Sequence, residues 1–165
     1  AAVAAHAEAM ADTAATVRLL QDGDGAGPRP PGPGLAQLPD LVAVAADAGV
    51  DLHLDVRADP AEVPAAVALV AHRICQEAVT NTLRHSATGR ADLSVVADGD
   101  SLTVRYLDHG PSRPVPDRGP AAVGGHGIAG MTARARTLGG SLRAGRCGAG
   151  HLVEAGLPLR PDGPS

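Results

Sequence analysis

The chain has 165 residues, a formal charge of −4 and 44% apolar residues. This length suits one domain with a buried core, and the acidic balance excludes a broadly basic protein that coats nucleic acid. No uncharged apolar stretch approaches the roughly 20 residues that span a bilayer, and no signal segment is evident. Cys75 and Cys147 form no Cys-x-x-Cys pair, which argues against a zinc ribbon or a disulfide framework. We therefore expect a soluble cytoplasmic domain.

The apolar composition limits the kind of core that this chain can build. There are 33 Ala, 17 Leu and 16 Val residues, while Phe and Trp are absent and Tyr106 is the only aromatic residue. All 14 basic residues are Arg, which indicates a GC-rich gene. Under that bias a residue with AT-rich codons is more often retained for its chemistry, and Asn81 is the only Asn in the chain.

The first part of the chain is predicted to lie outside the folded domain. Residues 1–22 favour a helix, because Val3, Met10 and Val17 recur every seven residues as in a coiled-coil seam. The Gly- and Pro-rich segment 23–34 that follows is typical of a linker. The domain itself should extend from residue 35 to residue 159, and residues 160–165 form a tail.

Within the domain, the periodicity predicts helices and strands in a mixed order. Gly49 should end a helix that starts near Leu35, and the alternating segment 50–57 predicts a strand. The later predictions are a long helix over 64–86, strands over 91–98 and 101–108, a long loop over 109–125, a helix from 127, and a hairpin of strands over 141–147 and 151–159. This order predicts a two-layer α/β sandwich with a mixed, mostly antiparallel sheet covered by helices.

Three polar residues share one face of the long predicted helix. Glu77, Asn81 and His85 are spaced four residues apart, so they stack along that face. A solvated stripe would explain them as well as a functional site would. The functional alternative is a metal–phosphate site, because an amide oxygen suits Mg²⁺ and a neighbouring carboxylate can orient or deprotonate water.

Two further segments carry candidate binding chemistry. Asp108 is expected at the end of a strand, followed by His109 and Gly110. Beyond the predicted loop, a glycine cluster over 124–130 precedes a helix, where backbone N–H groups and the helix N-terminus can meet phosphate oxygens. Alone, such a cluster is more often a turn.

Taken together, the three segments resemble a known family. The run 73–85 resembles the N box of sensor histidine kinases, 107–110 looks like their first glycine box, and 125–131 looks like the second. Segments 138–142 and 148–153 are similar to the family's closing strands. The form that these motifs take here is similar to that of the kinases that pair with response regulators carrying a helix-turn-helix output domain. The resemblance implies the GHKL, or Bergerat, ATPase fold shared with gyrase, Hsp90 and the mismatch-repair ATPases.

The resemblance also implies a role for individual residues. Asn81 would hold Mg²⁺, and Glu77 would be the catalytic acid beside it. Asp108 would accept the adenine amino hydrogen. The remaining expected ATP-binding residues are Arg84 and His85 near the phosphates, Gly110 at the adenine, Gly125, Gly127, Ile128, Gly130 and Met131 at the phosphate end, and Ser141 near the adenine pocket. Residues 109–124 would form a lid over ATP.

The chain also departs from the family pattern. Pro111 and Ser112 stand where a second glycine is common, and of the family's Arg-Glu-Arg only Arg134 remains. Residues 1–22 resemble the end of the second dimerisation helix, and His6 lacks the Asp neighbour of a phosphoacceptor His. We therefore expect a domain that binds ATP and Mg²⁺ but needs its own dimerisation and phosphoacceptor domain, outside this chain, to act on. A response regulator would be the final partner, and a homodimer is expected only in the full-length kinase.

Two other functions are compatible with the sequence. One is a non-catalytic, ATP-gated protein-interaction switch. The other is an anti-sigma-factor serine kinase, which shares the ATP fold but lacks a coiled-coil stub and linker. The other His residues, including His109 and His151, form no metal-binding pair in sequence, and Cys75 is expected to pack as a small apolar group.

Overall fold

The computed structural model describes residues 32–85, 89–111 and 125–160. The predicted coiled-coil stub over 1–22, most of the linker and most of the lid lie outside these residues. The described elements are a 3₁₀ turn η2 (Leu35–Gln37), helices α2 (Leu38–Asp47), α3 (Ala65–His85) and α4 (Gly125–Thr137), and strands β1 (Val50–Arg57), β2 (Gly89–Asp98), β3 (Ser101–Pro111), β4 (Ser141–Cys147) and β5 (Gly150–Pro158).

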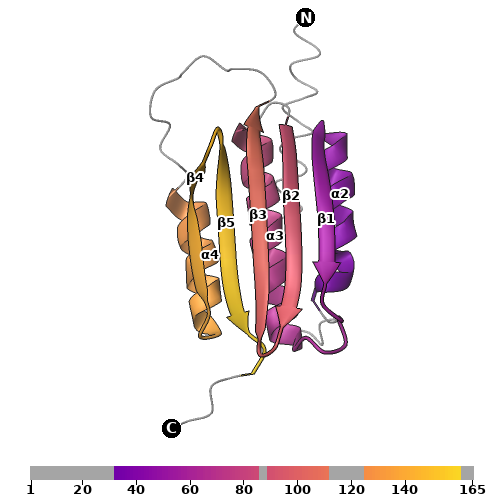
Figure 1. Cartoon of the computed structure of the whole chain (residues 1–165), viewed down its shortest axis with the longest axis vertical. Helices are drawn as coiled ribbons and strands as arrows, with labels where there is room; N and C mark the ends of the chain where they lie inside the picture. The colour runs from indigo at the N-terminus through magenta and orange to yellow at the C-terminus, as the bar shows by residue number, and fades with distance from the viewer. Residues whose placement is uncertain (1–31, 86–88, 112–124, 161–165) are drawn as a thin grey trace, which may run out of the picture. The chain divides into compact units, whose positions relative to one another are not determined.

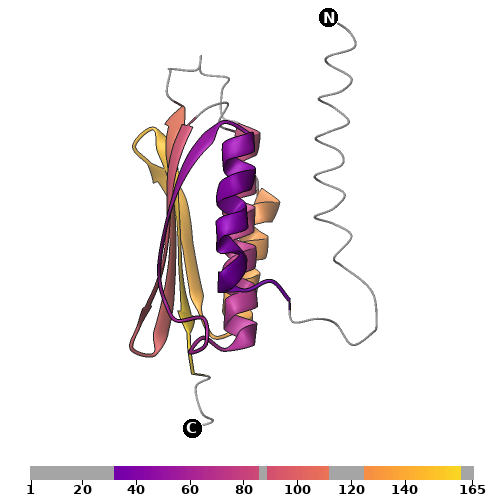
Figure 2. The same ribbon diagram turned by 90° about the vertical axis from the view of Figure 1, so that its right-hand side faces the viewer.

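The strands form one sheet in the order β1-β2-β3-β5-β4. β1 runs parallel to β2, and the other neighbouring pairs are antiparallel. Helices α2, α3 and α4 cover one face of this sheet, and no helix of the described residues lies over the other face (Figures 1 and 2). The predicted two-layer α/β sandwich with a mostly antiparallel sheet is confirmed.

The core lies between the sheet and the helices, and it is built almost entirely from aliphatic residues. Alternation along the strands places one set of side chains toward the helices. On β3, for example, Leu102, Val104 and Tyr106 are buried. Cys75 on α3 has no exposed surface, and burial raises the pKa of its thiol to about 12, so it packs as the small apolar group that the sequence predicts. Among the described residues, no helix is both long and apolar enough to cross a bilayer.

Several element boundaries differ from the sequence prediction. β3 continues through His109 and Gly110 to Pro111, so Asp108 lies inside a paired strand instead of at its end. β2 begins at Gly89, and α4 begins at Gly125. Strand pairing explains the first two differences, because Gly89 pairs with Pro111 and Asp108 pairs with His151 across the sheet. A polar or Gly-rich strand end is held by its neighbours and leaves little signal in local periodicity.

The termini of the site-bearing elements gather at one end of the sheet. The C-terminal ends of α3 and β3, the start of α4 and the turn between β4 and β5 all lie at the upper end in Figure 1. Because these elements are far apart in sequence, only the folded sheet brings the candidate residues on them together.

Candidate nucleotide-binding site

Gly127 at the start of α4 lies against the polar face of α3. A Cβ atom placed on Gly127 would be 2.6 Å from Glu77 Oε1 and 3.2 Å from Asn81 Nδ2. Real Cβ atoms do not approach other atoms as closely as the first distance, so a larger residue at 127 would have to displace the Glu77 side chain. The structure therefore brings the predicted acid, the predicted metal ligand and the second glycine box into one group. Glu77 and Asn81 are both half-buried, as expected for side chains that border a site.

The carboxylate of Asp108 is fixed on both of its oxygens. It is only 7% exposed. The Gly110 N–H donates to Oδ1 at 2.7 Å, and the Thr82 hydroxyl donates to Oδ2 at 3.2 Å. A carboxylate offers about four acceptor positions, so these two donors alone do not exhaust its hydrogen-bonding capacity. The two donors orient the group.

Tyr106 extends this chain of hydrogen bonds into the core. Its hydroxyl donates to Thr82 Oγ1 at 2.8 Å. Burial raises the pKa of Tyr106 to about 12, with the nearby Asp108 charge adding to the rise and the Thr82 hydrogen bond opposing it. The phenol therefore stays protonated and remains a donor at neutral pH. The direction of the chain, from Tyr106 through Thr82 to Asp108, keeps the carboxylate an acceptor.

Gly110 lets the end of β3 approach the β4–β5 turn. Its φ is +81°, and an added Cβ atom would lie 2.6 Å from the carbonyl oxygen of Ala149. Both the backbone conformation and the contact require glycine. Gly110, from the predicted first glycine box, thus contacts both the Asp108 carboxylate and the turn between β4 and β5.

The remaining predicted site residues differ in burial and in their position on α3 and α4. Ile128 is half-buried on α4, and Met131 one turn of α4 beyond Gly127 is fully buried in the core, so it supports the site through packing. A Cβ atom on Gly130 would lie 3.1 Å from Arg134 Nη1, which places the Arg134 side chain along that stretch of the helix. Arg84 is exposed near the C-terminal end of α3. Gly125 is the first residue of α4, and the side chain of His85 lies outside the described part of the structure.

The structure does not bring Ser141 to the group, contrary to the expectation that it lies near the adenine pocket. Ser141 is exposed at the start of β4 and pairs with Gly156, which in turn pairs with Thr103 on β3. Thr103 is five residues from Asp108, a separation of about 17 Å at the rise of a strand. Ser141 therefore lies at the opposite end of the sheet. Ser141 is the first residue of β4, at the open end of the β4–β5 hairpin, whereas the turn of that hairpin lies beside Gly110. The position of the serine in the sequence did not show at which end of the sheet β4 begins.

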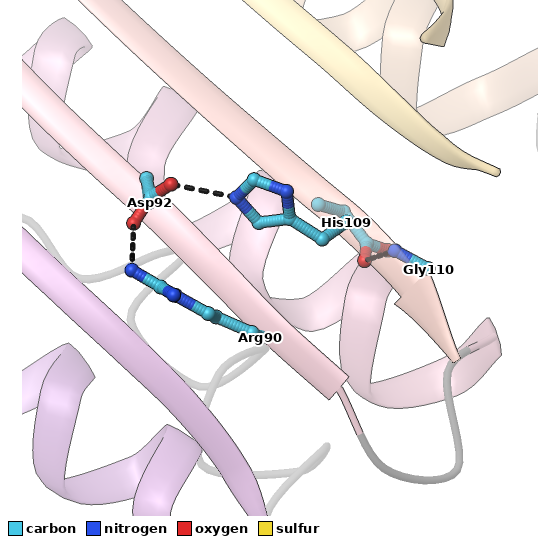
Figure 3. Close-up of polar contacts among 5 residues, drawn as sticks. Arg90, Asp92, His109 and Gly110 are labelled. Carbon is cyan, nitrogen blue, oxygen red and sulfur yellow. Dashed lines mark hydrogen bonds and ion pairs between the residues drawn. The ribbon is translucent and has the colours of Figure 1, made fainter. Parts of the chain in front are cut away.

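His109, the neighbour of Asp108, points to the other face of the sheet. Its Nε2 lies 2.6 Å from Asp92 Oδ2, and Arg90 lies 3.9 Å from the other oxygen of the same carboxylate (Figure 3). The hydrogen bond with His109 is the main reason that the pKa of Asp92 is below its usual value. These residues belong to the solvent-facing side of the sheet and take no part in the site. Within the described ranges, no three His, Cys, Asp or Glu residues are arranged to hold a metal ion.

Sequence reasoning missed Thr82 and Tyr106 as supports of Asp108. A signal was present for both residues: Thr82 directly follows Asn81 within the N-box-like run, and Tyr106 is the only aromatic residue in the chain. Their link to Asp108 depends on the packing of α3 against β3, which local patterns do not encode.

The comparisons with known proteins point to histidine kinases. Sensor histidine kinase LnrJ of Bacillus subtilis (strain 168) is 31% identical over 97 residues, which cover 59% of this chain and 23% of LnrJ. The matched region is thus about a quarter of that relative. No protein-family model matches the chain.

Solved structures of three histidine kinases share the fold. The Acinetobacter baumannii histidine kinase AdeS has a TM-score of 0.58 at 18% identity, covering 75% of this chain and 64% of that chain. The histidine kinase domain of the Erythrobacter litoralis EL346 blue-light activated kinase has a TM-score of 0.56 at 24% identity, covering 73% and 57%. The catalytic domain of histidine kinase ThkA, in a nucleotide-free form, has a TM-score of 0.57 at 12% identity, covering 78% and 96%. The chain therefore has the fold of a histidine kinase catalytic domain, and the resemblance inferred from the sequence motifs is confirmed.

Proposed function

We propose that this chain is the ATP-binding catalytic domain of a sensor histidine kinase. It transfers the γ-phosphate of ATP to a His on a dimerisation domain outside this chain, for relay to a response regulator in the cytoplasm. The observation that carries the proposal is the contact of Gly127 with Glu77 and Asn81, at the end of the sheet that also holds Asp108. Glu77 and Asn81 share one face of α3 by their spacing, whereas Gly127 of α4 meets them only through the tertiary fold.

The residues present fit Mg-ATP. Asp108 is a fixed acceptor for the adenine amino group, because both of its oxygens are already oriented by protein donors. Asn81 would hold Mg²⁺ through its side-chain oxygen, and the glycines at the start of α4 leave the backbone open to phosphate oxygens. A bound Mg²⁺ would neutralise charge that develops on the phosphates. Glu77, next to Asn81 and Gly127, would position the attacking imidazole and receive its proton.

The test of the kinase proposal is phosphate transfer in trans. The chain alone, the parent's dimerisation domain alone and their mixture are incubated with γ-labelled ATP, and acid-labile label is measured. We expect label only in the mixture and only on the dimerisation domain, since transfer depends mainly on positioning and charge stabilisation. Glu77→Gln should lower the rate by about 100-fold or more while keeping ATP binding, whereas the exposed Glu62→Gln should not.

Three outcomes would contradict the proposal. Label on the isolated chain that is lost in His6→Ala would make His6 a phosphoacceptor. ATP binding without transfer in the mixture would favour the ATP-gated switch. That alternative is motivated by the sequence, in which Pro111 and Ser112 follow Gly110 where a second glycine is common. Transfer to a serine of a separate protein would favour the anti-sigma-factor type.

Asp108→Asn is expected to weaken adenine-nucleotide binding by about tenfold or more. A hydrogen bond to a charged acceptor contributes about 1.5–3 kcal/mol, and the amide would also place a donor against the Thr82 hydroxyl. Calorimetry with Mg-ADP measures the change. The matched control is Asp92→Asn, which removes a carboxylate from the solvent-facing side of the sheet and should leave the affinity unchanged. Equal losses in the two variants would contradict the assignment.

A further inference from the structure

The two edges of the sheet carry opposite charge. β1 and β4 each have a neighbouring strand on one side only, and α2 packs on β1 while α4 packs on β4 (Figure 1). The acidic edge, formed by α2 and β1, holds four carboxylates and one Arg: Asp40, Asp47, Asp51, Asp55 and Arg57. The basic edge, formed by α4 and β4, holds four Arg and no acidic residue: Arg134, Arg136, Arg143 and Arg146.

Most of these charges have no partner within the domain. Asp55 pairs with Arg57, and Arg143 pairs with Glu154 of β5. In the described part of the chain, the other charged residues of the two edges form no ion pair. All of the edge charges except Asp55 are exposed. Each edge is therefore complementary to the opposite edge of another copy of the chain.

Both edge strands are regular enough to accept a further strand. β1 and β4 contain no Pro, and their registers with β2 and β5 run without a shift. Proteins commonly protect an exposed edge with Pro, bulges or charges. Here the charges repel a like edge but attract the opposite one. Because β4 runs antiparallel to β1, two copies side by side in the same orientation bring β4 of one against β1 of the next as antiparallel neighbours.

A row of polar side chains on the helix-free face indicates the register of such a pair. Across the five strands, the directly paired residues are Asp55, Ser94, Arg105, Glu154 and Arg143. The last three alternate in sign, and Glu154 forms ion pairs with the Arg on either side. Asp55 of a second copy, placed opposite Arg143, continues this alternation. Opposite charges on directly paired residues stabilise a sheet, whereas like charges destabilise it.

The same register aligns an apolar row on the helix-covered face. Across the five strands, that row consists of Val56, Val95, Val104, Ala155 and Leu142. Its three middle residues have no exposed surface, whereas Val56 is 37% exposed at the acidic edge and Leu142 is half-buried at the basic edge. When Arg143 lies opposite Asp55 of a second copy, Leu142 lies opposite Val56. The contact therefore removes apolar surface at both edges from water.

β4 also has room for a side chain from a facing strand. A hollow of about 280 Å³ is lined by Arg143, Ala144, Gly145, Arg146, Leu152 and Glu154. A Cβ atom added to Gly145 would meet nothing within 4 Å. In the register described above, the residue opposite Gly145 is His53 of the second copy, which is exposed on β1. A ring on the facing strand can cover a glycine in an edge strand.

We propose that the basic edge of this domain binds the acidic edge of a second copy, through antiparallel pairing of β4 with β1. Main-chain hydrogen bonds between the two edge strands hold the contact, and the charges set its direction and register. Because the two surfaces differ, the contact is head-to-tail and leaves one free edge at each end. It uses the edges of the sheet and does not depend on the proposed nucleotide site.

Analytical ultracentrifugation of the whole chain at rising concentration tests the inference. We expect the weight-average mass to keep rising past that of a dimer, because a head-to-tail contact does not close. Raising NaCl from about 0.1 M to about 1 M shortens the Debye length from about 10 Å to about 3 Å, which should weaken the association by about tenfold.

Reversing the charge of one edge strand at a time gives a sharper test. Arg143→Glu with Arg146→Glu makes both edge strands acidic, and Asp51→Arg with Asp55→Arg makes both basic. Each double variant alone should associate at least about tenfold more weakly than the original chain, since like charges then face each other. An equimolar mixture of the two variants should recover the association, because each presents the edge that the other lacks.

The matched control is Asp98→Arg with Asp100→Arg, where β2 turns into β3. This variant changes the net charge as much as the reversal on β1 does, but away from both edges, so it should associate like the original chain. Hydrogen exchange measures the strand pairing directly and needs no variant. As the protein concentration rises, backbone amides of β1 and β4 should exchange more slowly, and those of β2, β3 and β5 should not change.

Three results would overturn the inference. A mass that stays monomeric at every concentration, or that levels off at a dimer, excludes a head-to-tail contact. Association that is unchanged in both charge-reversed variants arises elsewhere in the chain, for example through the predicted coiled-coil segment 1–22. A mixture of the two variants that associates no better than either one alone shows that the two edges do not recognise each other.

Discussion

Asn81→Ala is expected to abolish magnesium-dependent nucleotide binding while leaving the apo protein at least as stable as before. Asn81 is half-buried within α3, where Ala has the better helix propensity by about 0.5 kcal/mol. Among the described residues no side-chain hydrogen bond ties Asn81 to the fold. A Cβ atom added to Gly127 would lie 3.2 Å from its amide nitrogen. We therefore expect Asn81 to contribute to nucleotide binding and not to the stability of the apo protein.

The measurement combines calorimetry with and without Mg²⁺ and thermal unfolding without nucleotide. Thr80→Ala is the matched control, because Thr80 lies on the same helix, about 100° around from Asn81, and bonds back to the Gln76 carbonyl. It should keep both the binding and the unfolding temperature. A markedly lower unfolding temperature for apo Asn81→Ala would show that the amide has a structural role, and the assignment of the metal ligand would be wrong.

Gly150→Ala is expected to destabilise the fold and to eliminate nucleotide binding together. A Cβ atom at residue 150 would overlap the Asp108 carbonyl oxygen and lie 2.8 Å from the Gly110 nitrogen. Asp108 and Gly150 both belong to backbone that is paired in the sheet, so the overlap is relieved by moving β3 away from the β4–β5 hairpin. Overpacking a well-packed region costs about 1–3 kcal/mol and sometimes more. The displaced residues include Asp108, which explains the simultaneous loss of binding.

Urea unfolding and ADP calorimetry measure the two effects. The control is Gly145→Ala on the neighbouring strand β4, where an added Cβ atom meets nothing within 4 Å. That variant should change the free energy of unfolding by no more than about 0.5 kcal/mol and keep the affinity. If the two alanine variants behave alike, the close approach of β3 and β5 at residue 150 does not organise the site.

Sequence patterns were most informative where burial or spacing is local. The alternation in 50–57 predicted β1 with the bounds that the structure has, and the polar row of the long helix identified Glu77 and Asn81. Gly49, which ends the α2 segment, has a φ of +81°, as expected for a glycine that stops a helix. The motif order also predicted that the N box and the second glycine box belong to one site, which the Gly127 contact supports.

The sequence by itself thus determined the fold class, the order of elements and the main polar residues, because these depend on periodicity and on motifs within single segments. Only the tertiary structure decided what lies beside Asp108. Strand register brings His151 next to it and sends Ser141 to the other end of the sheet, and the packing of α3 on β3 supplies Thr82 and Tyr106 as its supports. The physical reason is that pairing between distant strands, and contact between a helix and a sheet, are set by long-range burial and hydrogen bonding, which leave no local periodic signal.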